Sequence, residues 1–376
     1  MVKLIFAHTV NLNKILGISL LGAMISTSAL AGNDTKRGQA GAVELLINPW
    51  ARTSGMAGSN SGIVRGVEAT GINIAGLAGI RRTEINFCSA LYLVGTDIRI
   101  NSLGFGTKVG QGAMGLTMSS FSLGTFYETT GELPDGTGNT FSPQIFNFGA
   151  SYAKKFSQRI SAGVLVRGIS QSYNSASAFG LAFDAGIQYQ TGKRKEFKFG
   201  VSILNLGPKM SFGGDAFSAR GTKQGTGYSQ TLGLLTAAFE QPSMLNIGLG
   251  YDFYMEQNML KITPCFNFRS NSFTSDQYQV GVQASWKDMF MVRGGYDYQD
   301  GIINKSESTT TNLGPSFGAT FQMPFVRKSN GDMAPAEGNE DLFEGATKSK
   351  VVAIDYSYSM TRYFGGTHRF SILLSL

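Results

Sequence analysis

The sequence is poor in charge, in proline and in long apolar runs. Only 15% of its 376 residues are charged, against about 25% in an ordinary soluble domain, and only 9 are proline. Intrinsic disorder is excluded because a disordered chain carries more charge and fewer apolar residues than the 42% found here. Beyond residue 31 no apolar run reaches the roughly 18 residues of a transmembrane helix. Glycine does not recur at every third position, which excludes a collagen.

Cysteine and histidine are nearly absent, which removes most site chemistry. Cys88 and Cys265 lie far apart, each inside a predicted strand, so no disulfide scaffold or CxxC site is indicated. They are either paired with each other or, as we expect, two buried thiols. His368 is the one histidine after residue 31, too few for a zinc site, and no GxSxG motif supplies a nucleophile beside it. We therefore expect no enzyme, no metal and no cofactor.

What the sequence does have is glycine, aromatic residues and a two-residue alternation. It contains 49 Gly, 27 Phe and 14 Tyr, with a mean hydropathy of −0.03. In 246–254, Ile247, Leu249, Tyr251 and Phe253 alternate with polar or small residues. A soluble β-sandwich also alternates, but these segments run about 10–13 residues, nearer the bilayer-crossing length of about 9–11 than the usual 5–6. The pattern predicts an all-β protein, a transmembrane antiparallel β-barrel in contact with outer-membrane lipid.

Counting the alternating segments predicts about fourteen strands. Fifteen segments qualify: 83–93, 97–108, 112–123, 143–154, 159–171, 178–190, 196–206, 229–239, 244–254, 258–270, 276–287, 289–299, 312–323, 350–359 and 366–376. Bacterial barrels normally have an even number of strands, and 229–239 alternates least well, so we assign it to a loop. Tight turns then fall on the periplasmic side, at 155–158, 191–195 and 287–288, together with the longer 324–349. The long polar excursions become extracellular: 124–142, 207–243 and 300–311.

The chain divides into three predicted parts. Residues 1–31 have the pattern of a secretory signal peptide, with Lys3 and Lys14, an apolar stretch, and a small-x-small cleavage pattern ending at Ala31. Residues 83–376 form the barrel. Residues 32–82 are rich in Gly, Ala and Ser without clean alternation, and composition alone allows either a periplasmic tail or a plug in the lumen.

Charged residues of both signs fall on the predicted lumen faces. Because an unpaired buried charge is costly, we expect them to form paired networks that hold a plug. An ion pathway would carry one sign along a stripe. The residues are Asp184, Asp252, Asp297, Asp355, Arg159, Arg167, Lys198, Lys261, Arg269 and Arg293. The surplus of basic residues lies in the predicted periplasmic turns, so the pI of 9.3 does not indicate a nucleic-acid partner.

The N-terminal part resembles a known family. Its stretch 44–58, ELLINPWARTSGMAG, and the later NIAGLA at 73–78 are similar to the opening of PorV/PorQ-type proteins of Bacteroidetes, which are relatives of the FadL fatty-acid channels. Ile74 stands where the family has Pro, and the chain ends in Leu376 rather than an aromatic residue. The residues matching the proposed hatch motif are Asn48, Pro49, Ala51, Arg52, Gly55, Met56, Gly58, Asn73 and Gly76.

This resemblance implies a FadL-like fourteen-stranded barrel with an N-terminal hatch at 32–82, working in type IX protein secretion. Its implied partners are a large translocon barrel and the C-terminal signal domains of secreted cargo. We expect the three extracellular excursions to bind the cargo. The alternative is a FadL-like channel for hydrophobic small molecules, for which Pro264 is a candidate strand kink.

Overall fold

Fourteen long strands form one closed antiparallel sheet. The computed structural model describes residues 36–376 apart from 223–227, 256–258, 305, 307 and 326–349. Each strand pairs with the next along the sequence, β8 pairs with β9, and β1 pairs with β20, which closes the ring. The wall strands are β1 (Thr83–Leu91), β2 (Arg99–Val109), β3 (Gly112–Ser122), β6 (Gln144–Lys155), β7 (Ile160–Tyr173), β8 (Ala176–Thr191), β9 (Phe197–Leu206), β13 (Met244–Tyr251), β15 (Leu260–Asn271), β16 (Gln277–Trp286), β17 (Phe290–Gln299), β18 (Asn312–Phe325), β19 (Lys350–Thr361) and β20 (Thr367–Ser375).

The fourteen predicted strands are therefore confirmed, with ends within three residues of those expected. Segment 229–239 is correctly left out of the wall. It holds β12 (Ser229–Gly233), whose one partner in the described part of the chain is β11 (Ser218–Thr222), with which it forms a separate hairpin. Two short strands extend the wall sheet: β10 (Phe212–Gly213) pairs with β8, and β14 (Phe253–Met255) pairs with β15.

The two faces of the wall have opposite character. Along β2, Leu103 and Phe105 are 48% and 39% exposed. Gly104 and Gly106, which alternate with them, face residues of the N-terminal part of the chain. Along β20, Phe370 and Ile372 are exposed while Arg369 and Ser371 are buried. An apolar outer row and a polar inner row are what lipid outside and a lumen inside require. Among the described residues, no helix is both long enough and apolar enough to span a bilayer.

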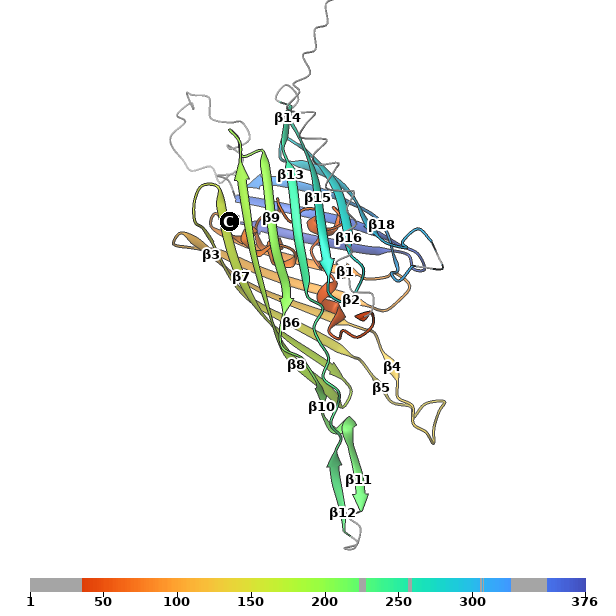
Figure 1. Cartoon of the computed structure of the whole chain (residues 1–376). Coiled ribbons are helices and arrows are strands. Elements are labelled where there is room, and N and C mark those ends of the chain that lie inside the picture. Colours follow the sequence, from red (N-terminus) through yellow and green to blue (C-terminus); the bar gives the residue numbers. More distant parts are fainter. Residues whose placement is uncertain (1–35, 223–227, 256–258, 305, 307, 326–349) are drawn as a thin grey trace, which may run out of the picture. The chain divides into compact units, whose positions relative to one another are not determined.

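The two ends of the strands differ. One, which we call the loop end, carries the three long excursions; among their elements are the hairpins β4 (Phe126–Tyr127)–β5 (Thr140–Phe141) and β11–β12, which extend beyond the wall (Figure 1). The other, the turn end, carries the tight turns, and there the Leu376 amide donates to the Thr83 carbonyl. Of the predicted long segment 324–349, residues 326–349 lie outside the described residues.

Residues 36–82, here called the N-terminal segment, run along the inner face of the wall from the loop end to the turn end. At the loop end Ala40 forms a bridge with Glu240, and at the turn end Thr83 begins β1. The segment contains four short helices, η2 (Val43–Leu46), α2 (Ala51–Ser54), η3 (Val67–Gly71) and η4 (Ile74–Gly79). Its Trp50, Ile74 and Leu77 are almost fully buried in one cluster with wall residues such as Ala113 and Leu165. The residues of the predicted signal peptide lie outside the described part.

Candidate functional site

The motif residue Arg52 ties the N-terminal segment to the wall. It lies in α2, and its Nε donates to Asp355 Oδ1 of β19 at 2.7 Å. Its Nε also lies 4.0 Å from a carboxyl oxygen of Glu68, which is 2% exposed. Thr320 and Ser371 donate further hydrogen bonds to Asp355. One guanidinium thus compensates two buried carboxylates, which would otherwise be costly to bury.

The motif glycines and Met56 mark places where two backbones touch. A Cβ on Gly55 would lie 3.0 Å from the Gly318 Cα, and one on Gly76 would lie 2.2 Å from the Val64 carbonyl oxygen. Gly58 has φ +77°, and a Cβ there would lie 3.1 Å from Arg269 Nη2. Met56 is 1% exposed, with its carbonyl against Gly295 of β17. A side chain at Gly55 or Gly58 would push the segment off the wall, and one at Gly76 would clash with Val64 inside the segment itself.

Asn73 fixes the start of η4. Its Oδ1 accepts from the Ala75 amide at 3.2 Å, which caps the helix. Its Nδ2 donates to the Ser61 carbonyl at 3.1 Å and to the Ile187 carbonyl of β8 at 3.2 Å. Ile74, which replaces the Pro of the resembled motif, is 1% exposed, so the turn buries an apolar side chain there.

Asn48, Pro49 and Ala51 order the entry to α2. The Asn48 Oδ1 accepts from the Trp50 amide at 3.0 Å, and the Pro49 carbonyl accepts from the Cys88 thiol at 3.1 Å. Ala51 is fully buried. Cys88 and Cys265 are both free and buried, so the expected state of the two thiols is confirmed.

The predicted pairing of inward charges is confirmed for part of the set. Arg167 lies 2.9 Å from Asp184, and Lys198 pairs with Asp252. Lys261 Nζ lies 3.5 Å from Asp288, a turn residue outside the predicted set. The Arg293 guanidinium instead donates to Gln283 and Thr320. Arg159 is exposed at the turn end rather than facing the lumen interior, because it precedes the first residue of β7.

A cavity of about 520 Å³ lies between the N-terminal segment and the loop end of the wall. The motif residues Asn48 and Gly58 line it, together with Thr309, Thr310 and Thr311 of the excursion 300–311. Its charged lining residues are Arg37, Arg269, Arg369 and Asp297. The alternation of β20 places Arg369 inward next to the outward Phe370, but the sequence does not reveal which inward positions surround a cavity.

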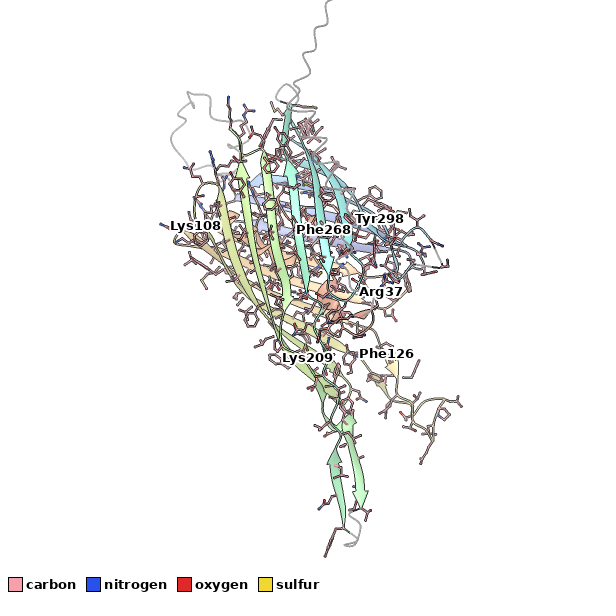
Figure 2. All side chains as sticks on the ribbon, in the orientation of Figure 1. Arg37, Lys108, Phe126, Lys209, Phe268 and Tyr298 are labelled. Atoms are coloured by element: carbon pink, nitrogen blue, oxygen red, sulfur yellow. The ribbon has the colours of Figure 1, made fainter. Side chains whose placement is uncertain are left out.

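The loop end also presents exposed apolar side chains. In the excursion 207–243, Tyr228, Leu232 and Leu235 are 74%, 52% and 102% exposed. The base of this excursion is anchored: Met210 and Phe239 exchange two backbone hydrogen bonds, and Met210 is 2% exposed. Lys209 lies 3.1 Å from Glu240, and its hydrogen bond and charge lower the pKa of that carboxyl. Figure 2 shows Lys209 at the base of the excursion.

Residues 91–332 match the family described as type IX secretion system membrane protein PorP/SprF. The match spans more than half of the sequence, from the end of β1 to the segment after β18. The chain belongs to the PorP/SprF family. It is thus a type IX secretion outer-membrane barrel, which agrees with the secretion system that the N-terminal motif indicates. The finer PorV/PorQ assignment stays a prediction. No curated protein matches the chain.

Solved structures share the barrel fold. The toluene transporter TodX of Pseudomonas putida has a TM-score of 0.50 and 11% identity, covering 87% of this chain and 97% of TodX. The alignment with the toluene transporter TbuX of Ralstonia pickettii (TM-score 0.46, 10% identity) covers 87% of this chain and 97% of TbuX. A FadL homologue of Pseudomonas aeruginosa (0.46, 12%) covers 86% and 97%. At 11% identity the likeness to TodX shows the barrel fold alone.

Proposed function

We propose that this barrel is a non-enzymatic subunit of the type IX secretion machinery that binds secreted cargo, the large translocon barrel, or both, through its loop end. Family membership supports the pathway. The observation that carries the binding role is the anchored excursion 207–243, which exposes apolar side chains in and beside β12 while its base packs into the wall. By the resemblance of the opening motif, the cargo element would be its C-terminal signal domain.

The N-terminal segment acts in this proposal as a plug, with 1–31 as the cleaved signal peptide and 83–376 as the outer-membrane barrel. The support is the set of contacts along its length. Arg52 bonds to Asp355, Asn73 to the Ile187 carbonyl, and Glu44 accepts from Gln171 at 2.8 Å. A segment held at several wall strands is suited to stay in place while the loops bind a partner.

The β11–β12 hairpin is the most specific binding element. Its two strands pair only with each other among the described residues, so both outer edges retain unpaired backbone groups. Such an edge can accept a strand from a partner, and Leu232 and Leu235 beside it supply apolar contact.

The test replaces residues 218–233 by a short Gly-Ser turn. The replacement keeps the Met210–Phe239 bridge, so the barrel should remain heat-modifiable on gels. We expect co-purification of translocon and cargo in mild detergent, read by mass spectrometry, to be lost. As a matched control, replacing the turn 156–159 should leave it unchanged. Unaltered co-purification after the hairpin replacement would contradict the proposal.

The alternative channel for hydrophobic molecules has less support. The cavity is lined by Arg269, Arg369 and Asp297, which suit a polar ligand. Pro264 does not break its strand: β15 pairs with β16 without interruption from Leu260 to Arg269. On the other side of β15 the pairing is interrupted opposite Thr263 and Pro264, between the Gly250–Cys265 and Phe253–Ile262 pairs. There the Asp252 carboxylate accepts from Thr263 at 2.7 Å. Fatty-acid uptake by cells carrying the barrel would revive this alternative.

A further inference from the structure

The cavity at the loop end holds a buried cation without an acidic partner. Arg369 is 6% exposed, and its Nη1 donates a hydrogen bond to Ser359 Oγ at 3.2 Å. Among the described residues no carboxylate lies within ion-pair distance of it, and its buried Nε has no hydrogen-bond partner. A buried guanidinium normally has its charge compensated, because leaving it unpaired is costly.

Other buried polar atoms of the lining are also unpaired among the described residues. They are Asp297 Oδ1 and Asn48 Nδ2, one acceptor and one donor. Asp297 is 6% exposed, and its other oxygen accepts from Gln277 at 2.9 Å. Both atoms have less than 1 Å² of accessible surface, so they lie just behind the cavity surface and not on it.

The rest of the lining is rich in hydroxyl and amide groups. Gln279, Ser316 and Asn271 are 1%, 3% and 5% exposed, deep in the cavity, whereas Thr309 and Thr311 are exposed at its mouth. Apart from Arg37, the described charged residues of the lining are Arg269, Arg369 and Asp297, two cations and one anion. The volume of about 520 Å³ falls within the range of about 300–1,000 Å³ typical of small-molecule sites.

We propose that this cavity binds a small hydroxylated organic anion, of the sugar-acid or sugar-phosphate class. The carboxylate or phosphate pairs with the Arg369 guanidinium, and the hydroxyl groups bond to the threonine hydroxyls and amide groups that line the cavity. The cavity opens between the excursion 300–311 and the N-terminal segment, so the ligand enters from the loop end. This binding role is separate from partner recognition by the β11–β12 hairpin.

The test is calorimetry on the full-length barrel in detergent with four probes: glucuronate, glucose 6-phosphate, glucose and inorganic phosphate. We expect at least one of the two anionic sugars to bind with a Kd of about 1 mM or lower, and at least tenfold more tightly than glucose. Binding by only one of them identifies its anionic group as the preferred one. Glucose binding as tightly, or no binding by either anionic sugar, would overturn the proposal. Inorganic phosphate binding as tightly as glucose 6-phosphate would overturn the role of the hydroxyl groups.

The variant Arg369→Gln should weaken the binding of the anionic sugar at least tenfold, which is about 1.4 kcal/mol. Arg369→Lys keeps the positive charge and should lose less affinity for the anionic sugar. The matched control is Arg159→Gln, which removes the same charge at the exposed turn end and should leave binding unchanged. Equal loss in Arg369→Gln and Arg159→Gln would mean non-specific attraction and would overturn the assignment. If Arg369→Gln fails to give a heat-modifiable barrel, the four-probe comparison on the unmodified protein still decides.

Discussion

Arg52 Nε donates a hydrogen bond to Asp355 Oδ1 at 2.7 Å, across 303 residues of sequence. Asp355 is fully buried on the inner face of β19, and Arg52 comes from the first helical turn after the Asn48-Pro49-Trp50 motif. The pair therefore couples the fold of the N-terminal segment to the closure of the barrel.

Arg52→Gln should destabilise the barrel by about 3 kcal/mol, because it leaves the carboxylates of Asp355 and Glu68 buried without their cation. Thermal unfolding in detergent, followed by heat-modifiable gel mobility, measures the loss. The double variant Arg52→Gln/Asp355→Asn should be more stable than Arg52→Gln alone, because it removes one unpaired buried charge, the Asp355 carboxylate. A double variant no more stable than the single one would contradict the coupling.

Gly76→Ala should lower the free energy of unfolding of the barrel by about 1–3 kcal/mol. The reason is that the added Cβ would lie 2.2 Å from the backbone oxygen of Val64. Gly131→Ala is its control: a Cβ there meets nothing within 4 Å. The same unfolding assay applies. Equal stability of the two variants would show that the segment does not pack as closely at Gly76 as described.

Asn73→Ala should cost about 1–3 kcal/mol, since the cap of η4 and the hydrogen bonds to the Ser61 and Ile187 carbonyls are lost together. Limited proteolysis offers a second readout, because a loosened segment exposes cleavage sites within 60–80. Asn139→Ala, in an exposed hairpin, should change neither quantity. Unchanged protease resistance in Asn73→Ala would argue against an anchoring role.

The wall could be predicted from the sequence because lipid and lumen impose a strict two-residue period. Segment 229–239, in which Leu232, Leu234 and Leu235 break the strict alternation, lies outside the wall. The N-terminal segment could not be placed in this way. Its short 3₁₀ turns and close backbone contacts, such as Gly55 on Gly318, leave no period in the sequence.

The candidate site was accessible to sequence reasoning only in pieces. Arg52 and Asn73 could be singled out from the resemblance of the motif, and Asp355 from its inward position. Their contacts with the wall join residues more than a hundred positions apart in the sequence. A two-residue alternation does not specify such contacts. The cavity around Arg369 depends on how seven or more segments enclose space, and one-dimensional patterns carry no such information.

The N-terminal segment crosses the lumen from the loop end to the turn end. We therefore predict that its first described residues lie on the extracellular side. Lys36 lies 3.8 Å from Glu240 there and is exposed, whereas Lys193 is exposed at the turn end. Both native cysteines are buried, so a new surface cysteine can be labelled selectively.

The most direct measurement is labelling of Lys36→Cys and Lys193→Cys in intact cells with a bulky, membrane-impermeant maleimide. We predict that Lys36→Cys reacts in intact cells and that Lys193→Cys reacts only after the outer membrane is opened. Labelling of Lys193→Cys but not Lys36→Cys in intact cells, or protection of both until the membrane is opened, would contradict a segment that reaches the extracellular end through the barrel.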